Sequence, residues 1–241
     1  RGAAEAGRRL VVAVGGDGTA SEVVDGLAQA GGATDFGFIP CGSGGDLRRT
    51  LAIPADLASA ARFLAGGPGR RLDLGRLELT GHDGRPAVRH FVNVASCGIT
   101  AVVAGLVNRS AKPLGGGLAY KLATTRALVG WGAPRVRWRA NGGAWQETAL
   151  TALSVCNGRF FGGGVMVAPE ARVDDGLLDV TVWSGFGLLD FVVHQPKIYD
   201  GRHVALAKTR TLRAREVEVE PLDGAEVLLE ADGELPGRLP A

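Results

Sequence analysis

The sequence predicts an α/β domain with a doubly wound parallel sheet, followed by a mainly antiparallel β-sandwich domain. Two apolar runs near the start of the 241-residue chain each end in a glycine-rich turn and alternate with helical patterns, as parallel strands do. Beyond the glycine- and proline-rich segment 66–69, the pattern changes to alternating strands joined by hairpin turns. We therefore expect a first domain at residues 1–68 and a β-rich second domain at residues 69–241.

The first predicted unit is a strand, a glycine turn and a helix. Leu10–Val14 is short, apolar and rich in valine, as in a buried parallel strand, and Gly15–Thr19 follows it directly. Thr19 and Glu22 have the spacing of a capping box, which predicts a helix that begins at Thr19. Backbone amides at such a turn bind phosphate, helped by the positive end of the helix dipole. Asp17 adds a carboxylate there, and a divalent cation would reconcile the carboxylate with phosphate.

The second unit repeats this arrangement. Phe36–Pro40 reads as a buried strand, Cys41–Asp46 as a glycine turn ending in a carboxylate, and Leu47–Leu51 as a short helix. Parallel strands of one sheet place their C-terminal turns along one edge, where α/β sheets bind ligands. We expect both turns to face one nucleotide, although ordinary tight strand-to-helix connections would leave the same pattern.

The rest of the chain reads as a helix and then as paired strands with helical interruptions. Helices are expected over Asp56–Leu64, over Leu188–Val193, and on both sides of a glycine-rich break within residues 99–128. The expected strands are Leu72–Leu79, His90–Val94, Arg135–Ala140, Thr148–Val155, Asp179–Trp183, Thr209–Glu220 and Glu226–Glu230. This pattern predicts an all-β second domain.

Composition and charge exclude several classes of protein. A net charge of +2 is too small to indicate a nucleic-acid-binding protein. The three cysteines are odd in number and widely spaced, which favours a reducing cytoplasm over disulfides. No apolar run approaches the length of a membrane span. We therefore expect a cytoplasmic protein.

Six motifs, in order along the chain, resemble those of the diacylglycerol kinase-type lipid kinases, which include bacterial diacylglycerol kinases and relatives of sphingosine kinase. Gly15–Thr19 is a complete Gly-Gly-Asp-Gly-Thr, and Gly42–Leu47 stands where the family has Gly-Thr-Gly-Asn-Asp-Phe. The later motifs are Gly117–Tyr120, Asn157–Pro169, Asp174–Val180 and Asp232–Glu234. NAD kinases share the first motif, whereas the later motifs favour the lipid kinases.

The resemblance implies an ATP-dependent lipid kinase that transfers the γ-phosphoryl group to a lipid hydroxyl, turning diacylglycerol into phosphatidate, with ATP and Mg²⁺ as cofactors. It implies that Glu234 is the general base and that Asp17 acts through Mg²⁺. Asp46 has the alternative of capping the helix that follows it, and Glu234 that of a solvated turn. The residues expected to hold the nucleotide are Gly15, Gly16, Asp17, Gly18, Thr19, Ser43, Gly44 and Asp46.

The resemblance also implies a second cation site and a membrane partner. The carboxylate of Asp175 and the backbone carbonyls of Arg172 and Leu177 would bind the cation, although a plain Asp-Gly turn would explain the same residues. A lipid acceptor implies peripheral contact with the inner membrane face. The arginines that alternate over residues 135–139 are either simply solvated or able to contact an anionic membrane.

The chain departs from the family pattern at its ends and in its second motif. The family has a strand and helix before the first motif and a further strand after the last, so we expect a chain cut at both ends. Gly45 replaces the asparagine of the second motif. These departures leave open a degenerate, non-catalytic module that binds lipid or nucleotide, and the shared first motif leaves open an NAD kinase-like enzyme.

Overall fold

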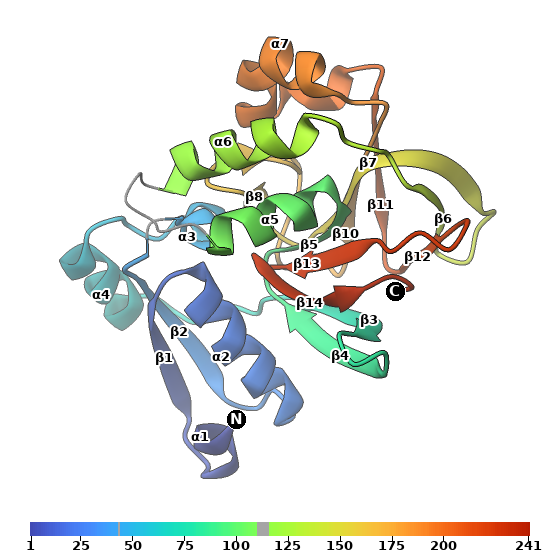
Figure 1. Cartoon of the computed structure of the whole chain (residues 1–241). Helices are drawn as coiled ribbons and strands as arrows, with labels where there is room; N and C mark the ends of the chain where they lie inside the picture. Colours follow the sequence, from blue (N-terminus) through green and yellow to red (C-terminus); the bar gives the residue numbers. More distant parts are fainter. Residues whose placement is uncertain (43, 110–115) are drawn as a thin grey trace.

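The computed structural model describes residues 1–42, 44–109 and 116–241. An α/β layer forms the N-terminal part, and a larger antiparallel layer that carries helices forms the rest (Figure 1). This arrangement confirms the predicted fold class, whereas the domain boundary after residue 68 stays a prediction. The elements of the first layer are α1 (Gly2–Glu5), β1 (Leu10–Gly15), α2 (Asp17–Gln29), β2 (Asp35–Pro40), α3 (Asp46–Leu51) and α4 (Leu57–Gly66).

The two predicted glycine turns lie side by side. β1 and β2 pair in parallel along their whole length, so both turns leave the sheet at one edge. The amide of Cys41 donates a hydrogen bond to the carbonyl of Gly15 at 2.7 Å. A Cβ on Gly42 would lie 2.4 Å from the Cα of Gly16, so this close approach of the two backbones requires glycine.

The second part is an antiparallel sandwich. One sheet has the order β11-β10-β7-β5-β13-β14-β3-β4, while β6 pairs with β12 and with the first residues of β7. An apolar core that includes Val136, Trp138 and Leu153 lies between the faces. The strands are β3 (Gly75–Gly81), β4 (Pro86–Phe91), β5 (Val94–Gly98), β6 (Arg135–Ala140), β7 (Gln146–Cys156), β8 (Phe160–Phe161), β9 (Val165–Met166), β10 (Leu178–Ser184), β11 (Thr209–Ala214), β12 (Val217–Pro221), β13 (Leu228–Ala231) and β14 (Glu234–Arg238).

Helices cover the other face of the large sheet. These are α5 (Ile99–Arg109), α6 (Gly116–Leu128), α7 (Leu188–Tyr199) and a 3₁₀ turn (Arg202–Ala205). Of them, α6 and α7 lie on the side away from β1 and β2 (Figure 1). The second part is thus not all-β, because the apolar second face of the sheet needs a covering layer. Within the described ranges, no helix combines the length and the apolar character needed to cross a bilayer.

The first long helix begins earlier than predicted. α2 begins at Asp17 with Gly16 as its N-cap, and not at Thr19. The capping-box spacing predicts the wrong helix start because a single residue, Gly16, connects β1 to α2. Thr19 therefore already lies in the first helical turn. Thr19 instead packs back on the strand end, since a Cβ on Gly15 would lie 2.7 Å from the Thr19 hydroxyl oxygen.

Two predicted strands are each interrupted by a side chain that binds backbone amides. The strand expected over His90–Val94 breaks between β4 and β5, where the Asp232 carboxylate accepts three successive amides. The strand expected over Thr209–Glu220 is two strands, since Asn141 accepts the amides of residues 215 and 216 at the break. Neither partner is close in sequence to the segment that it interrupts.

A buried carboxylate joins the α/β layer to the large sheet. Asp25 on α2 accepts hydrogen bonds from the Arg89 guanidinium and the His90 amide of β4, both at 2.8 Å. A buried ion pair whose oxygens are satisfied in this way fixes the relative position of two elements. It holds α2, and therefore the first glycine turn, against the sheet in which β13 and β14 carry the last motif.

Candidate active site

The two glycine turns meet through the side chain of Asp17. Its carboxylate accepts the amide of Asp46 at 3.0 Å and the amide of Leu47 at 3.2 Å. Asp17 therefore caps α3 from another element, because the N-cap residue of α3, Gly45, has no side chain. The alternative reading of Asp46 as the cap of α3 is wrong, since Asp46 is the first residue inside that helix.

Asp46 points into the same space and is held there by two donors. Its Oδ1 accepts a hydrogen bond from Arg49 at 2.8 Å, and its Oδ2 accepts the amide of Gly163 at 2.8 Å. Asp46 is 7% exposed, and this burial raises the pKa of its carboxyl to about 6. The charge of Asp17 also raises the pKa, whereas the Gly163 amide and Arg49 lower it. Because the charges of Asp17 and Asp46 repel each other, a cation beside both would be favourable.

The N-terminus of α2 has a different environment. Its first-turn amides have no partner within the helix, and no side chain of the described residues caps them. Glu234, the exposed first residue of β14, approaches this turn, since a Cβ on Gly18 would lie 3.4 Å from the Glu234 carboxylate. The structure thus brings the first and last motifs together, although Gly18 and Glu234 are 216 positions apart in the chain.

Two further acids fix the turn that presents Glu234. Asp232 accepts the amides of residues 92, 93 and 94 at 2.9–3.0 Å. Glu230 accepts the Ser96 hydroxyl at 2.6 Å and the Gly233 amide at 2.8 Å, and it is only 4% exposed. Burial raises the pKa of Glu230 to about 7, although both hydrogen bonds lower it.

Glu230 was missed in the sequence. Its signal is a single acid within the apolar run Val227–Ala231, which is costly to bury without a role.

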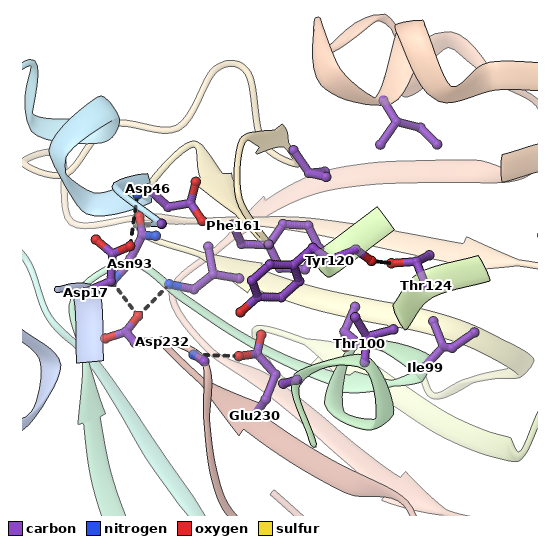
Figure 2. Close-up of a pocket in the computed structure, with 18 of the residues that line it drawn as sticks. Asp17, Asp46, Asn93, Ile99, Thr100, Tyr120, Thr124, Phe161, Glu230 and Asp232 are labelled. Carbon is purple, nitrogen blue, oxygen red and sulfur yellow. Dashed lines mark hydrogen bonds between the residues drawn. The ribbon is translucent and has the colours of Figure 1, made fainter. Parts of the chain in front are cut away.

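Asp17, Asp46, Glu230, Asp232 and Gly233 are among the residues that line one cavity of about 150 Å³, whereas Glu234 is not. Asp17, Asp46 and Asp232 gather at one end, while Ile99 and Thr100 lie at the other and Tyr120 lies between them (Figure 2). We call these the acid end and the apolar end. The apolar end is lined mainly by Ile99, Val103, Leu128, Trp183, Phe186, Phe191 and Ile198. Burial raises the pKa of the Tyr120 phenol, which keeps it neutral and able to donate a hydrogen bond.

The predicted nucleotide residues are partly assembled at the acid end. Asp17, Gly44 and Asp46 line the cavity, and a Cβ on Gly44 would lie 2.7 Å from the Asp17 carboxylate. Gly15, Gly16, Gly18 and Thr19 form the adjoining end of β1 and start of α2. Ser43 lies outside the described residues. Their predicted roles in binding nucleotide remain predictions.

The predicted second cation site lies elsewhere. Arg172, Asp175 and Leu177 are not among the residues that line the cavity. Asp175 accepts the amide of Leu177 at 3.1 Å and forms an ion pair with Arg213 of β11, while Arg172 lies 3.7 Å from Asp174. Arg213 already supplies a positive charge to Asp175, so a cation there would compete with it. In the ranges that the structure describes, no three His, Cys, Asp or Glu side chains form a metal-binding group.

The acid end nevertheless suits Mg²⁺ and phosphate by its donor set. Carboxylate oxygens of Asp17 and Asp46 are the hard ligands that Mg²⁺ prefers, and one or two carboxylates are its usual protein ligands beside substrate phosphates. Burial and the charge of Asp17 raise the pKa of Asp46 although Arg49 lies 2.8 Å from its carboxylate, and a cation beside the two carboxylates would lower that pKa. The free amides of α2 would face the phosphates.

Two family models together match almost the whole chain. The model of the diacylglycerol kinase catalytic domain matches residues 1–77. The model described as YegS C-terminal NAD kinase beta sandwich-like domain matches residues 93–241.

Curated relatives carry names that agree with these models. The diacylglycerol kinase of Bacillus subtilis (strain 168) is 30% identical over 233 residues, which cover 96% of this chain and 73% of that protein. The diacylglycerol kinase of Mycobacterium tuberculosis (strain H37Rv) is 32% identical, with 98% of this chain and 73% of that protein covered. A protein named probable lipid kinase YegS-like, from Pseudomonas aeruginosa PAO1, is 36% identical over 73% of this chain. The match spans only 55% of the Pseudomonas protein.

Solved structures share the fold. A diacylglycerol kinase from Bacillus anthracis str. Sterne matches with a TM-score of 0.64 at 21% identity, covering 96% of this chain and 71% of that chain. Two further structures from the same organism give TM-scores of 0.67 and 0.69.

Proposed function

The chain belongs to the diacylglycerol kinase family of lipid kinases, and on that premise we propose that it transfers the γ-phosphoryl group of ATP to the hydroxyl of a diacylglycerol. The observation that supports this most is one cavity with an acid end beside a helix N-terminus and an apolar end that suits acyl chains. The acceptor hydroxyl would lie where the two ends meet.

The acid end supplies the groups that phosphoryl transfer needs. The amides at the start of α2 would bind the phosphates, and Asp17 and Asp46 would hold Mg²⁺, which would offset the charge of the transferring group. Glu234 approaches from β14 and takes the proton of the acceptor hydroxyl. The hydroxyl oxygen then bonds to the γ-phosphorus as the bond from that phosphorus to the leaving ADP oxygen breaks. Asp232 and Glu230 position Glu234 by holding its turn.

The apolar end argues for a lipid acceptor over NAD. Side chains such as Val103, Phe191 and Ile198 offer no hydrogen-bond partner to the ribose hydroxyls and carboxamide of NAD, which would lose their water on entry. Acyl chains lose no hydrogen bonds there and gain from leaving water. The retained acids Asp17 and Glu234 favour an enzyme over a non-catalytic binding module.

The test is turnover of Mg-ATP with diacylglycerol in detergent micelles, compared with NAD as acceptor. We expect phosphatidate from diacylglycerol, no NAD-dependent ATP consumption, and a loss of turnover of about 10²–10⁴-fold in Glu234→Gln. Phosphorylation of NAD in place of lipid would reject the proposal, and so would Glu234→Gln turning over at the wild-type rate.

A further inference from the structure

Helix α7 has two apolar faces, and only one of them is covered. Phe191 and Ile198 pack into the core and line the cavity. On the other face, Leu189, Val192 and Val193 are 76%, 60% and 59% exposed. The second helix at the cavity, α6, repeats this arrangement.

On α6, Tyr120, Thr124 and Leu128 line the cavity, while Leu118 and Leu122 are exposed. A helix at a protein surface normally turns charged or polar residues outward, so two neighbouring helices with apolar outer faces indicate a partner. We call the exposed side chains the outer apolar face; they are Leu118, Leu122, Leu189, Val192 and Val193.

The charge beside the outer apolar face is positive. The two helices carry Lys121, Arg126 and Lys197, none of which belongs to an ion pair with another described residue. Lys121 lies 4.8 Å from the ring of Tyr199, so a cation sits at the junction of α6 and α7. The acid of α7, Asp190, is already paired with Lys208.

We propose that the outer apolar face of α6 and α7 docks on an anionic lipid bilayer. Apolar side chains flanked by unpaired cations match such a surface, since the former enter the acyl boundary while the latter meet the anionic headgroups. A symmetric dimer through the same face would bring Lys121, Arg126 and Lys197 of two copies together, which disfavours a second copy as the occupant.

This bilayer contact would bring the lipid acceptor to the site, and that role rests on the proposed function. The inner faces of the docked helices line the apolar end of the cavity, so an acceptor lipid would pass from the bilayer to the acids along α6 and α7. It also replaces the sequence-based candidate for membrane contact. Arg135, Arg137 and Arg139 form ion pairs with Glu147, Glu220 and Glu218, and their charge is therefore already matched.

The first test measures binding to vesicles without nucleotide, so that it does not depend on catalysis. The protein is sedimented with vesicles of phosphatidylcholine alone and with vesicles that also contain phosphatidylglycerol. We expect binding to the anionic vesicles that weakens with salt, and a loss of about tenfold or more in Val192→Asp/Val193→Asp. Leu57→Asp is the matched control, since Leu57 on α4 is 57% exposed and lies in the other layer. Its binding should equal that of the wild type.

Equal binding by the wild type and the double variant would overturn the proposal, as would a failure of the wild type to bind anionic vesicles. So would a concentration-dependent dimer in sedimentation that the double variant abolishes, because a second copy would then cover the face. All the replaced side chains are exposed, and thermal unfolding checks that the variants are folded.

A second measurement separates docking from chemistry. A short-chain diacylglycerol dispersed below its micelle concentration needs no membrane. We expect the double variant to phosphorylate it at the wild-type rate but to lose turnover on vesicle-borne diacylglycerol. Equal loss on both acceptors would overturn the docking role. Vesicle binding by a wild type that phosphorylates no lipid would reject the proposed function and leave the bilayer contact standing.

Discussion

Helices α2 and α3 look alike in sequence, and their N-termini differ in structure. Both follow a parallel strand and a glycine turn, and both have an aspartate as their first residue. The first amides of α3 are taken by Asp17, whereas no side chain in the described part of the chain caps those of α2. Only α2 keeps an open, electropositive end for a phosphate. The second turn contributes the carboxylate of Asp46, and the amides at the start of its helix are already bonded to Asp17. Two similar motifs in one chain can therefore supply different parts of one site.

Among variants of these two turns, removal of the Asp17 carboxylate should have the largest effect on turnover. Asp17→Ala leaves the α3 amides uncapped and removes a cation ligand, so we expect turnover to fall by about 10³-fold or more and the free energy of unfolding by about 1 kcal/mol. Turnover and denaturant unfolding measure the two losses. Asp17→Asn is the control, because its amide oxygen still accepts one amide of α3. It should recover much of the stability and little of the turnover; recovery of both would contradict a role for the charge.

Asp46→Asn removes the negative charge at the second turn and keeps a side chain of the same shape there. The wild-type carboxyl has its pKa raised from 3.8 to about 6, so without a cation it is mostly protonated below that pH and must lose the proton for a cation to bind. Turnover of the wild type should rise with pH through about 6, and this limb should vanish in the variant together with about 10–100-fold of the rate. The pH dependence of the free energy of unfolding has the opposite sign to that of turnover. A raised pKa lowers wild-type stability as pH rises from 3.8 to 6, and the variant should lack that slope.

Glu230 extends the comparison to the third acidic turn, where the carboxylate acts on structure. Its pKa is raised from 4.5 to about 7, so the wild type should lose stability as pH rises between these values. Glu230→Gln should flatten that slope and cost about 1 kcal/mol at pH 5, because the amide group cannot accept both existing hydrogen bonds. Thermal unfolding at several pH values measures this. Ser96→Ala is the control, since it removes one donor and keeps the titrating group; an unchanged slope in Glu230→Gln would contradict the assignment.

The sequence predicted contiguous features and missed those that join distant segments. Gly15–Thr19 and Cys41–Asp46 lie within short runs whose pattern follows from backbone geometry, so their shared sheet edge was predictable. The hydrogen bond between Asp17 and Leu47 joins residues 30 positions apart in the sequence, and that between Ser96 and Glu230 joins residues 134 positions apart. The apolar end was also missed, because its residues are scattered over α5, α6, α7 and β10 and form no short motif.

Gly45 offers the smallest and sharpest test of the second turn. Its φ of 70° and ψ of 28° are left-handed, a conformation that glycine and asparagine adopt more readily than other residues. Asparagine at this position in the family and glycine here thus meet one backbone requirement. A Cβ would lie 3.2 Å from the Nε of Arg48, at the far end of a side chain that can move.

Gly45→Asn should therefore change the free energy of unfolding by less than about 1 kcal/mol, whereas Gly45→Val should cost more than that, since a β-branched residue is strained there. Gly42→Ala is the contrasting variant in the same turn. Its new Cβ would meet the Gly16 backbone at 2.4 Å, which has no side chain to yield, so the two turns must separate. Denaturant unfolding ranks the three. If Gly45→Asn were as damaging as Gly42→Ala, the second turn would depend on close approach at both positions, and the left-handed conformation would not explain the residue at position 45.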